Sequence, residues 1–133
     1  MNESIVVTGR IRIPYQWAAG PFVSRFLTAL RDKKELWGVG CSVCKKVIVP
    51  PQARCPFCDG ACDTPKQVGP KGTLETWTRS GDRTFGVIRL NGADTGMVHL
   101  LEGEPRTGQT VEPVFNDERK GHILDIRHFR AVT

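Results

Sequence analysis

The stretch Cys41–Cys58, with the sequence CSVCKKVIVPPQARCPFC, contains two Cys-x-x-Cys pairs separated by ten residues. Two residues between paired cysteines let the backbone turn so that both sulfurs face one ion, and two such pairs complete a tetrahedron of thiolates with bonds of about 2.3 Å. Tetrahedral sulfur ligation selects zinc or iron. We therefore predict a metal site made by four residues: Cys41, Cys44, Cys55 and Cys58.

Structural zinc is the leading interpretation of this site, and two alternatives stay open. One is a redox-active iron site of the rubredoxin type. The other is a pair of disulfides in a secreted protein, which the tight spacing and the odd total of five cysteines disfavour. Lys45 and Lys46 are expected to offset part of the thiolate charge. We expect Gly60 to let the chain leave the second pair in a left-handed conformation.

The residues around the cysteines are rich in Cys, Pro and Gly and poor in large apolar side chains over 37–62. Such a segment cannot build a sizeable apolar core. We expect the metal to provide the folding free energy that burial does not. A linker rich in Pro and Gly is predicted to follow at 63–71.

The first 36 residues divide into an extended lead-in and a helix. Residues 1–20 show no sustained period, although residues 5–13 could pair as a short strand or lie as an arm on another surface. Pro21 suits the first turn of a helix. Apolar side chains then recur at helical spacing at Phe22, Phe26, Leu27 and Leu30, and predict an amphipathic helix of about three turns. Its apolar stripe must be buried on this chain or on a partner subunit.

Beyond the linker, short alternating runs separated by turn residues predict five strands and no helix. The predicted strands span 72–80, 84–90, 95–101, 109–115 and 122–129. Gly86 is expected to mark a bulge. Five short strands in about 60 residues favour a small barrel, with the OB type first and an SH3-like barrel second.

The predicted fold is therefore mainly β with a short N-terminal helix. It comprises a rubredoxin-like zinc ribbon followed by a five-stranded OB-fold barrel. The predicted segments are an arm and amphipathic helix over 1–36, the zinc ribbon over 37–70 and the barrel over 71–133.

The charge of this 133-residue chain is uneven: a formal +5 arises from ten Lys and Arg against five Asp and Glu in residues 1–70, and nine of each in residues 71–133. A basic half suits an anionic cofactor, an acidic partner surface or nucleic acid. We expect no membrane span, because no run approaches the roughly 18 apolar residues that one requires, and we expect a cytoplasmic protein.

No residue pattern predicts a catalytic centre in this chain. The three histidines, His99, His122 and His128, fall in or beside predicted strands and are expected to be surface or core residues. Cys62 has no base nearby in the sequence. Binding is the natural alternative to catalysis. Trp77 and Phe85 could stack nucleic-acid bases on an OB barrel, although we favour a core position for both.

Three further motifs lie outside the cysteine pairs, and together with the Val-Pro-Pro segment at 49–51 they carry a family resemblance. They are the WAAG segment at 17–20 followed by Phe26-Leu27, the RLNGADT segment at 89–95, and the DER and GHILDI segments at 117–119 and 121–126. In this order, from about Tyr15 onward, the chain resembles the zinc-ribbon/OB-fold family of acyl-CoA-associated proteins.

The resemblance implies a non-catalytic accessory subunit of a thiolase-fold enzyme, such as the thiolase that cleaves benzoylsuccinyl-CoA, or of a related aldolase. Such a subunit assists binding of the CoA thioester and access to an active site on its partner, and it holds structural zinc. For the CoA phosphates we nominate four basic residues, since Arg can hold phosphate bidentately: Arg25, Lys45, Lys46 and Arg54. A zinc-ribbon/OB-fold protein that binds nucleic acid is the alternative function.

Overall fold

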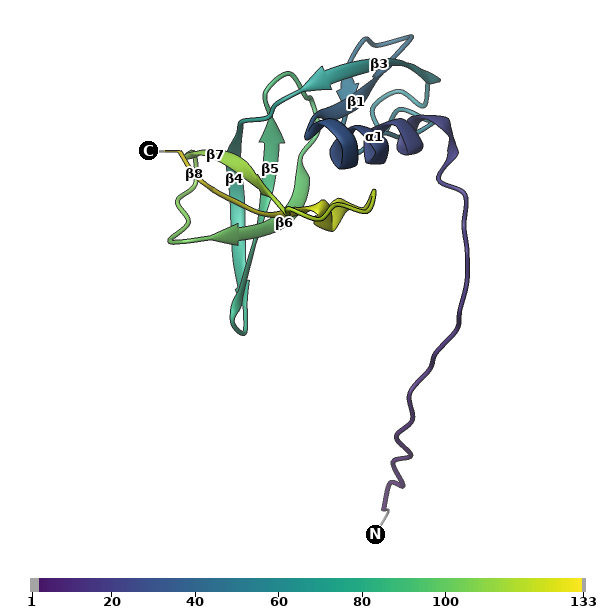
Figure 1. Ribbon diagram of the computed structural model, residues 1–133, viewed down its shortest axis with the longest axis vertical. Helices are drawn as coiled ribbons and strands as arrows, with labels where there is room; N and C mark the ends of the chain where they lie inside the picture. The colour runs from purple at the N-terminus through teal and green to yellow at the C-terminus, as the bar shows by residue number, and fades with distance from the viewer. Residues whose placement is uncertain (1–2, 133) are drawn as a thin grey trace.

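The computed structural model describes residues 3–132 and contains one α-helix and eight strands within that range. Residues 1–2 and 133, at the ends of the first and last predicted segments, lie outside the described residues. Three strands form a small sheet and five form a closed barrel, with the helix beside both (Figure 1). The predicted fold class is confirmed: the chain is mainly β, with a cysteine cluster next to a five-stranded barrel.

Helix α1 spans Gly20–Lys33, close to the predicted start at Pro21. Its buried residues, Phe26, Ala29 and Leu30, lie on one face and pack on this chain rather than awaiting a partner. The helix ends at Lys34, which adopts a left-handed conformation and whose N–H bonds to the Ala29 carbonyl. The helix is too short and too polar to span a membrane.

The small sheet has the order β2-β1-β3, with bounds β1 Leu36–Cys41, β2 Val47–Ile48 and β3 Cys62–Val68. The prediction of a linker over 63–71 is therefore wrong for most of its length. Pro65 suggested a loop, but β3 pairs with β1 alone, and proline is tolerated in such an edge strand because one side needs no ladder hydrogen bond.

The barrel closes in the order β4-β5-β6-β8-β7, with β7 returning to β4. The last strand lies between the third and fourth, which is the Greek-key connectivity of the predicted OB type. The bounds are β4 Gly72–Ser80, β5 Arg83–Leu90, β6 Met97–Glu102, β7 Thr110–Phe115 and β8 Ile126–Ala131.

Two details of the barrel differ from expectation. The predicted strand at 122–129 begins with a short 3-10 helix, η1 Ile123–Asp125, because Asp125 and His122 cap each other's backbone. The bulge expected at Gly86 is absent there. The register between β4 and β5 shifts instead in β4, between Leu74 and Thr76. Gly86 is instead needed for close packing, since a Cβ there would lie 2.5 Å from Leu74 and 2.7 Å from Leu101.

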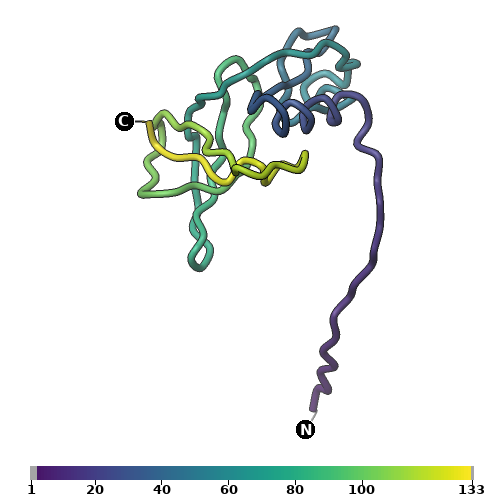
Figure 2. The backbone as a smooth tube through the Cα atoms, viewed as in Figure 1, coloured from purple at the N-terminus to yellow at the C-terminus, as the bar shows by residue number. Residues whose placement is uncertain are grey.

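One continuous apolar core joins the helix, the small sheet and the barrel. Phe26 and Leu30 of α1 and Leu36 of β1 belong to the same buried cluster as the barrel residues Ile88 and Phe129. All five are at most 2% exposed. Because their buried side chains pack in this one cluster, the three elements lie against one another in a single body (Figure 2).

The barrel also holds the outer edge of β2 directly. The Asp94 carboxylate accepts from the Val47 N–H at 2.8 Å, and the Asp94 N–H donates to the Val47 carbonyl at 2.8 Å. The Thr95 hydroxyl accepts from the Val49 N–H at 2.8 Å and donates to its carbonyl at 2.9 Å. These four hydrogen bonds, which we name the ribbon–barrel junction, take the place of a neighbouring strand.

Asp125 stabilises the loop at residues 119–122, which precedes η1. Its buried carboxylate accepts hydrogen bonds from the N–H groups of Lys120, Gly121 and His122 at 2.8–3.1 Å. Arg119 extends this loop to the helix, where its guanidinium donates to the Arg31 carbonyl at 2.8 Å. Burial alone would raise the pKa of Asp125, but the three N–H groups hold it below its ordinary 3.8.

We expect Thr95→Val to lower the free energy of unfolding by about 2 kcal/mol, because it leaves the N–H and carbonyl of buried Val49 without partners. The measurement is urea unfolding at pH 7. Thr78→Val, at an exposed position of β4, is the matched control and should change the stability by less than about 0.5 kcal/mol. Equal effects of the two variants would contradict this role of Thr95.

Asp125→Asn should cost about 2 kcal/mol at pH 7, because a neutral amide is a weaker acceptor for three N–H groups. Since the folded state lowers the pKa of Asp125, its stabilisation is present above pH 3.8 and is lost as the pH falls through the folded-state value. The difference between the two proteins in urea unfolding should therefore shrink below about pH 4. A difference that stays constant down to pH 2 would contradict the ionic part of this account.

Candidate metal centre

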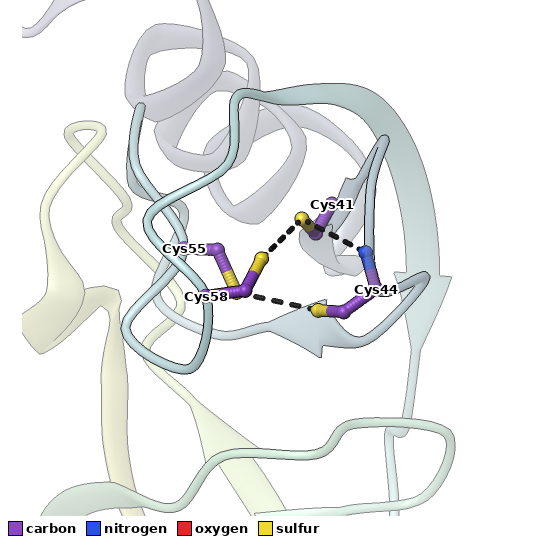
Figure 3. A group of neighbouring side chains, drawn as sticks. All are labelled: Cys41, Cys44, Cys55 and Cys58. Atoms are coloured by element: carbon purple, nitrogen blue, oxygen red, sulfur yellow. Dashed lines mark hydrogen bonds between the residues drawn. The ribbon is translucent and has the colours of Figure 1, made fainter.

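The four predicted cysteines come together at one end of the small sheet (Figure 3). Their sulfur atoms all lie within 4.8 Å of one another, and the Cys41–Cys58 and Cys44–Cys55 pairs are each 3.5 Å apart. A tetrahedral zinc ion with four bonds of about 2.3 Å places its sulfurs about 3.8 Å apart. The donor set and its spacing therefore fit a closed four-thiolate metal site.

Each cysteine pair sits in a turn of the same construction. In the first turn, the Cys41 N–H donates to the Lys46 carbonyl at 2.9 Å, and the Lys45 N–H donates to the Cys41 carbonyl at 3.1 Å. In the second turn, the Cys55 N–H donates to the Gly60 carbonyl and the Asp59 N–H donates to the Cys55 carbonyl, both at 2.9 Å. We call these turns the two knuckles. In each knuckle, the N–H of the residue two positions after the first cysteine donates to the sulfur of that cysteine. The distances from Val43 to Cys41 and from Phe57 to Cys55 are both 3.4 Å.

The left-handed residue in each knuckle is not the predicted glycine. Lys45 and Asp59, four residues after the first cysteine of each pair, have φ values of 67° and 61°. Gly60 has no positive φ and is required for another reason. A Cβ there would lie 2.8 Å from a Val43 methyl group and 3.1 Å from the Cys41 sulfur, so any larger residue would push against the first knuckle.

Backbone dipoles favour a thiolate at the most buried ligand. A hydrogen bond from the Cys44 N–H, together with one from Val43, lowers the pKa of Cys41 from 9.0 to about 6. The Lys46 N–H also lowers the pKa of Cys44, but burial and the neighbouring sulfurs raise it to about 12. The backbone therefore favours negative charge on Cys41, and a thiolate is the form in which cysteine binds a metal ion.

Cys62 lies beside the site without belonging to it. It pairs with Cys41 across β1 and β3, is 3% exposed, and packs with the ligands in a small cluster that also contains Val39 and Ile48. Burial, and then the charges of the neighbouring Cys41 and Cys55 sulfurs, raise the pKa of Cys62. It is a packing thiol under the metal site. This cluster also gives residues 37–62 more apolar core than the sequence led us to expect.

The four basic residues nominated for CoA phosphates are all exposed but lie in different settings. Lys45 donates to the Ser42 carbonyl at 2.9 Å, and the Lys46 ammonium lies 4.9 Å from the Phe57 ring centre. Arg54 donates to the Asp59 carbonyl at 3.2 Å. These three surround the knuckles, whereas Arg25 lies on α1 and lines a shallow cavity with Trp37.

Each of the three histidines makes contacts that hold the fold together. His99 is buried against Phe129, with Nδ1 accepting from the Leu100 N–H at 2.8 Å, and burial lowers its pKa. His122 caps η1, and the His128 imidazole lies 2.6 Å from the Glu102 carboxylate.

The expectation of a core position for Trp77 is wrong, since Trp77 is 40% exposed near the end of the β4–β5 hairpin. Opposite partners in an antiparallel pair share a face, and Trp77 pairs with Gly86 while Phe85 pairs with Thr78. Trp77 and Phe85 therefore project from opposite faces of the two strands. They do not form the joint stacking surface that a base-binding barrel would need.

Several solved structures share this fold, and two of them show the likeness. A protein of unknown function from the DUF35 family of Sulfolobus solfataricus matches with a TM-score of 0.67 at 15% identity, over 85% of this chain and 87% of its own. A chain of the Ltp2-ChsH2(DUF35) aldolase matches with a TM-score of 0.59 at 16% identity, over 89% of this chain and 100% of its own. At these identities the likeness shows the fold alone. No family model and no curated protein matches the sequence.

Cys44→Ser should abolish stoichiometric metal binding, because a closed four-thiolate site loses one ligand. We expect one zinc ion per wild-type chain by elemental analysis, and loss of the ribbon's protection from proteolysis when a chelator removes it.

Cys62→Ala is the control, since it removes a neighbouring thiol that is not a ligand. It should keep one zinc ion per chain while lowering the thermal midpoint. Bound iron with a visible colour would instead establish the rubredoxin-type alternative. Full metal retention by Cys44→Ser would refute the assigned ligand set.

Proposed function

We propose that this chain is a non-catalytic, zinc-binding accessory subunit of an acyl-CoA thiolase or of a related thiolase-fold or aldolase complex. The observation that carries the proposal is the fold match along nearly the whole chain to a subunit of the Ltp2-ChsH2(DUF35) aldolase, together with the four-cysteine cluster. We propose that the ion is zinc, that the protein works in the cytoplasm, and that the arm and helix (1–36), ribbon (37–70) and barrel (71–133) act as its parts.

The role proposed for the ribbon is to help bind the CoA thioester and to shape access to the partner's active site. When bound, zinc supplies rigidity to the knuckles and no open coordination position. Three of the nominated residues, Lys45, Lys46 and Arg54, surround the knuckles, so a phosphate could meet more than one cation there. Arg25 would contribute from the helix.

The geometry favours this role over nucleic-acid binding. An OB barrel that stacks bases needs aromatic faces gathered in one basic groove. Here Trp77 and Phe85 project from opposite faces. The barrel segment also carries as many acidic as basic residues. A partner protein and a thioester are therefore the better-supported ligands.

The proposal predicts that a thiolase-fold enzyme is encoded beside this gene, and co-expression of the two chains tests it. We expect the two chains to co-elute in gel filtration and ion exchange, and the complex to bind acyl-CoA at least tenfold more tightly than the enzyme alone. The measurement is calorimetric titration with the thioester.

The Cys44→Ser variant tests the part that the ribbon plays, because the substitution lies in the cysteine cluster and outside the arm and the barrel. It should reduce the gain in thioester affinity. The proposal fails if the chains never co-elute and the enzyme is fully active on its own.

A further inference from the structure

The largest set of exposed apolar side chains in the described structure lies before the helix. Seven of the twelve large hydrophobic residues that stay exposed fall in residues 5–17, with exposures from 66% to 90%: Ile5, Val6, Val7, Ile11, Ile13, Tyr15 and Trp17. Solvated tails are poor in such side chains. This arm runs away from the folded body as an extended chain (Figures 1 and 2).

The second half of the arm has the pattern of a β-strand. Over residues 9–17 (GRIRIPYQW), the large apolar side chains fall at every odd position from Ile11 to Trp17, while Arg10, Arg12 and Gln16 fall at even positions. Successive side chains of a strand point to opposite faces. An extended chain here therefore has one wholly apolar face and one basic, polar face.

Pro14 restricts how this strand can pair. In a strand, the N–H and carbonyl groups of alternate residues point to opposite edges. Pro14 has no N–H, and it shares its edge with Arg10 and Arg12. Only the other edge, formed by the odd residues 11–17, offers an unbroken set of donors. The residue before a proline also favours extended backbone, which suits Ile13.

This chain offers the arm no matching sheet edge within its described residues. The barrel is closed, and the ribbon–barrel junction occupies the outer edge of β2. The free edge of β3 carries polar, exposed side chains such as Asp63 and Lys66. A second copy is therefore a poor acceptor for four large apolar side chains.

We propose that residues 9–17 are a docking strand that adds to a free sheet edge of the partner enzyme. Its apolar face would fill a hydrophobic groove, and Arg10 and Arg12 would meet carboxylates along the rim. This assignment rests on the proposed function, because it takes the acceptor to be the thiolase-fold or aldolase subunit. At about 3.3 Å per residue, the seventeen residues 3–19 can reach roughly 55 Å from the helix.

The test uses the full-length chain and the co-expressed enzyme. Ile11→Asp/Ile13→Asp should weaken the complex at least 100-fold, because it places two carboxylates in an apolar groove. Thr8→Asp/Gln16→Asp adds the same charge on the even face and should weaken it by less than threefold. Affinities are measured by calorimetry, and unchanged thermal midpoints confirm that both variants fold.

A second readout separates strand addition from looser contact. In the complex, hydrogen exchange should slow at the amides of Ile11, Ile13, Tyr15 and Trp17 and stay fast at Arg10 and Arg12. Uniform protection of all six amides, or protection of none, would overturn pairing along one edge.

The outcomes distinguish this inference from the function it rests on. If the wild-type chain binds the enzyme and Ile11→Asp/Ile13→Asp binds equally well, the docking strand is refuted and the accessory role stands. If the wild-type chain does not bind, the accessory role and this choice of acceptor both fail. A different result would be a homodimer of the wild-type chain in sedimentation that the Ile11→Asp/Ile13→Asp substitution dissociates. That result would reassign the strand to a second copy and overturn the proposal.

Discussion

Two separate turns bring four sulfur atoms within 4.8 Å of one another, close enough to share a single metal ion, and this close approach constrains the shape of the ribbon. The first knuckle begins with Cys41 at the end of β1, and each knuckle reverses the chain through a left-handed residue, Lys45 or Asp59. Gly60 then lets the second knuckle approach to van der Waals contact with the first. Backbone N–H groups of Val43 and Phe57 donate to the sulfurs of Cys41 and Cys55, which partly satisfies these two sulfurs within the turns themselves.

The barrel is held in a fixed position relative to the ribbon. One apolar core runs from Leu30 of the helix to Phe129 of the barrel, and the ribbon–barrel junction bonds the strand between the knuckles to the loop between β5 and β6. Movement of the ribbon alone would expose core surface and break four hydrogen bonds. The cysteine cluster and the barrel surface therefore keep a constant relative orientation.

The clustering of the four cysteines and most of the strands could be predicted, because cysteine spacing and side-chain alternation are local signals; the bounds of β4 agree with the prediction. The sequence did not reveal β3, because Pro65 is compatible with a strand only when the second edge is free. The steric need for a glycine at position 60 could not be predicted either, because the atoms that crowd this position belong to the other knuckle. The junction depends on Asp94 meeting Val47 across 47 positions of sequence, which no local pattern encodes.

The proline of the arm has a further consequence for solubility. A long apolar strand exposed to water is a template for edge-to-edge stacking, in which each added strand presents a fresh edge to the next. Because Pro14 removes a donor from one edge, a strand that has paired once presents an interrupted ladder outward, and the charges of Arg10 and Arg12 repel another copy there. The proline that limits the proposed pairing to one edge thus also disfavours edge-to-edge stacking of exposed arms.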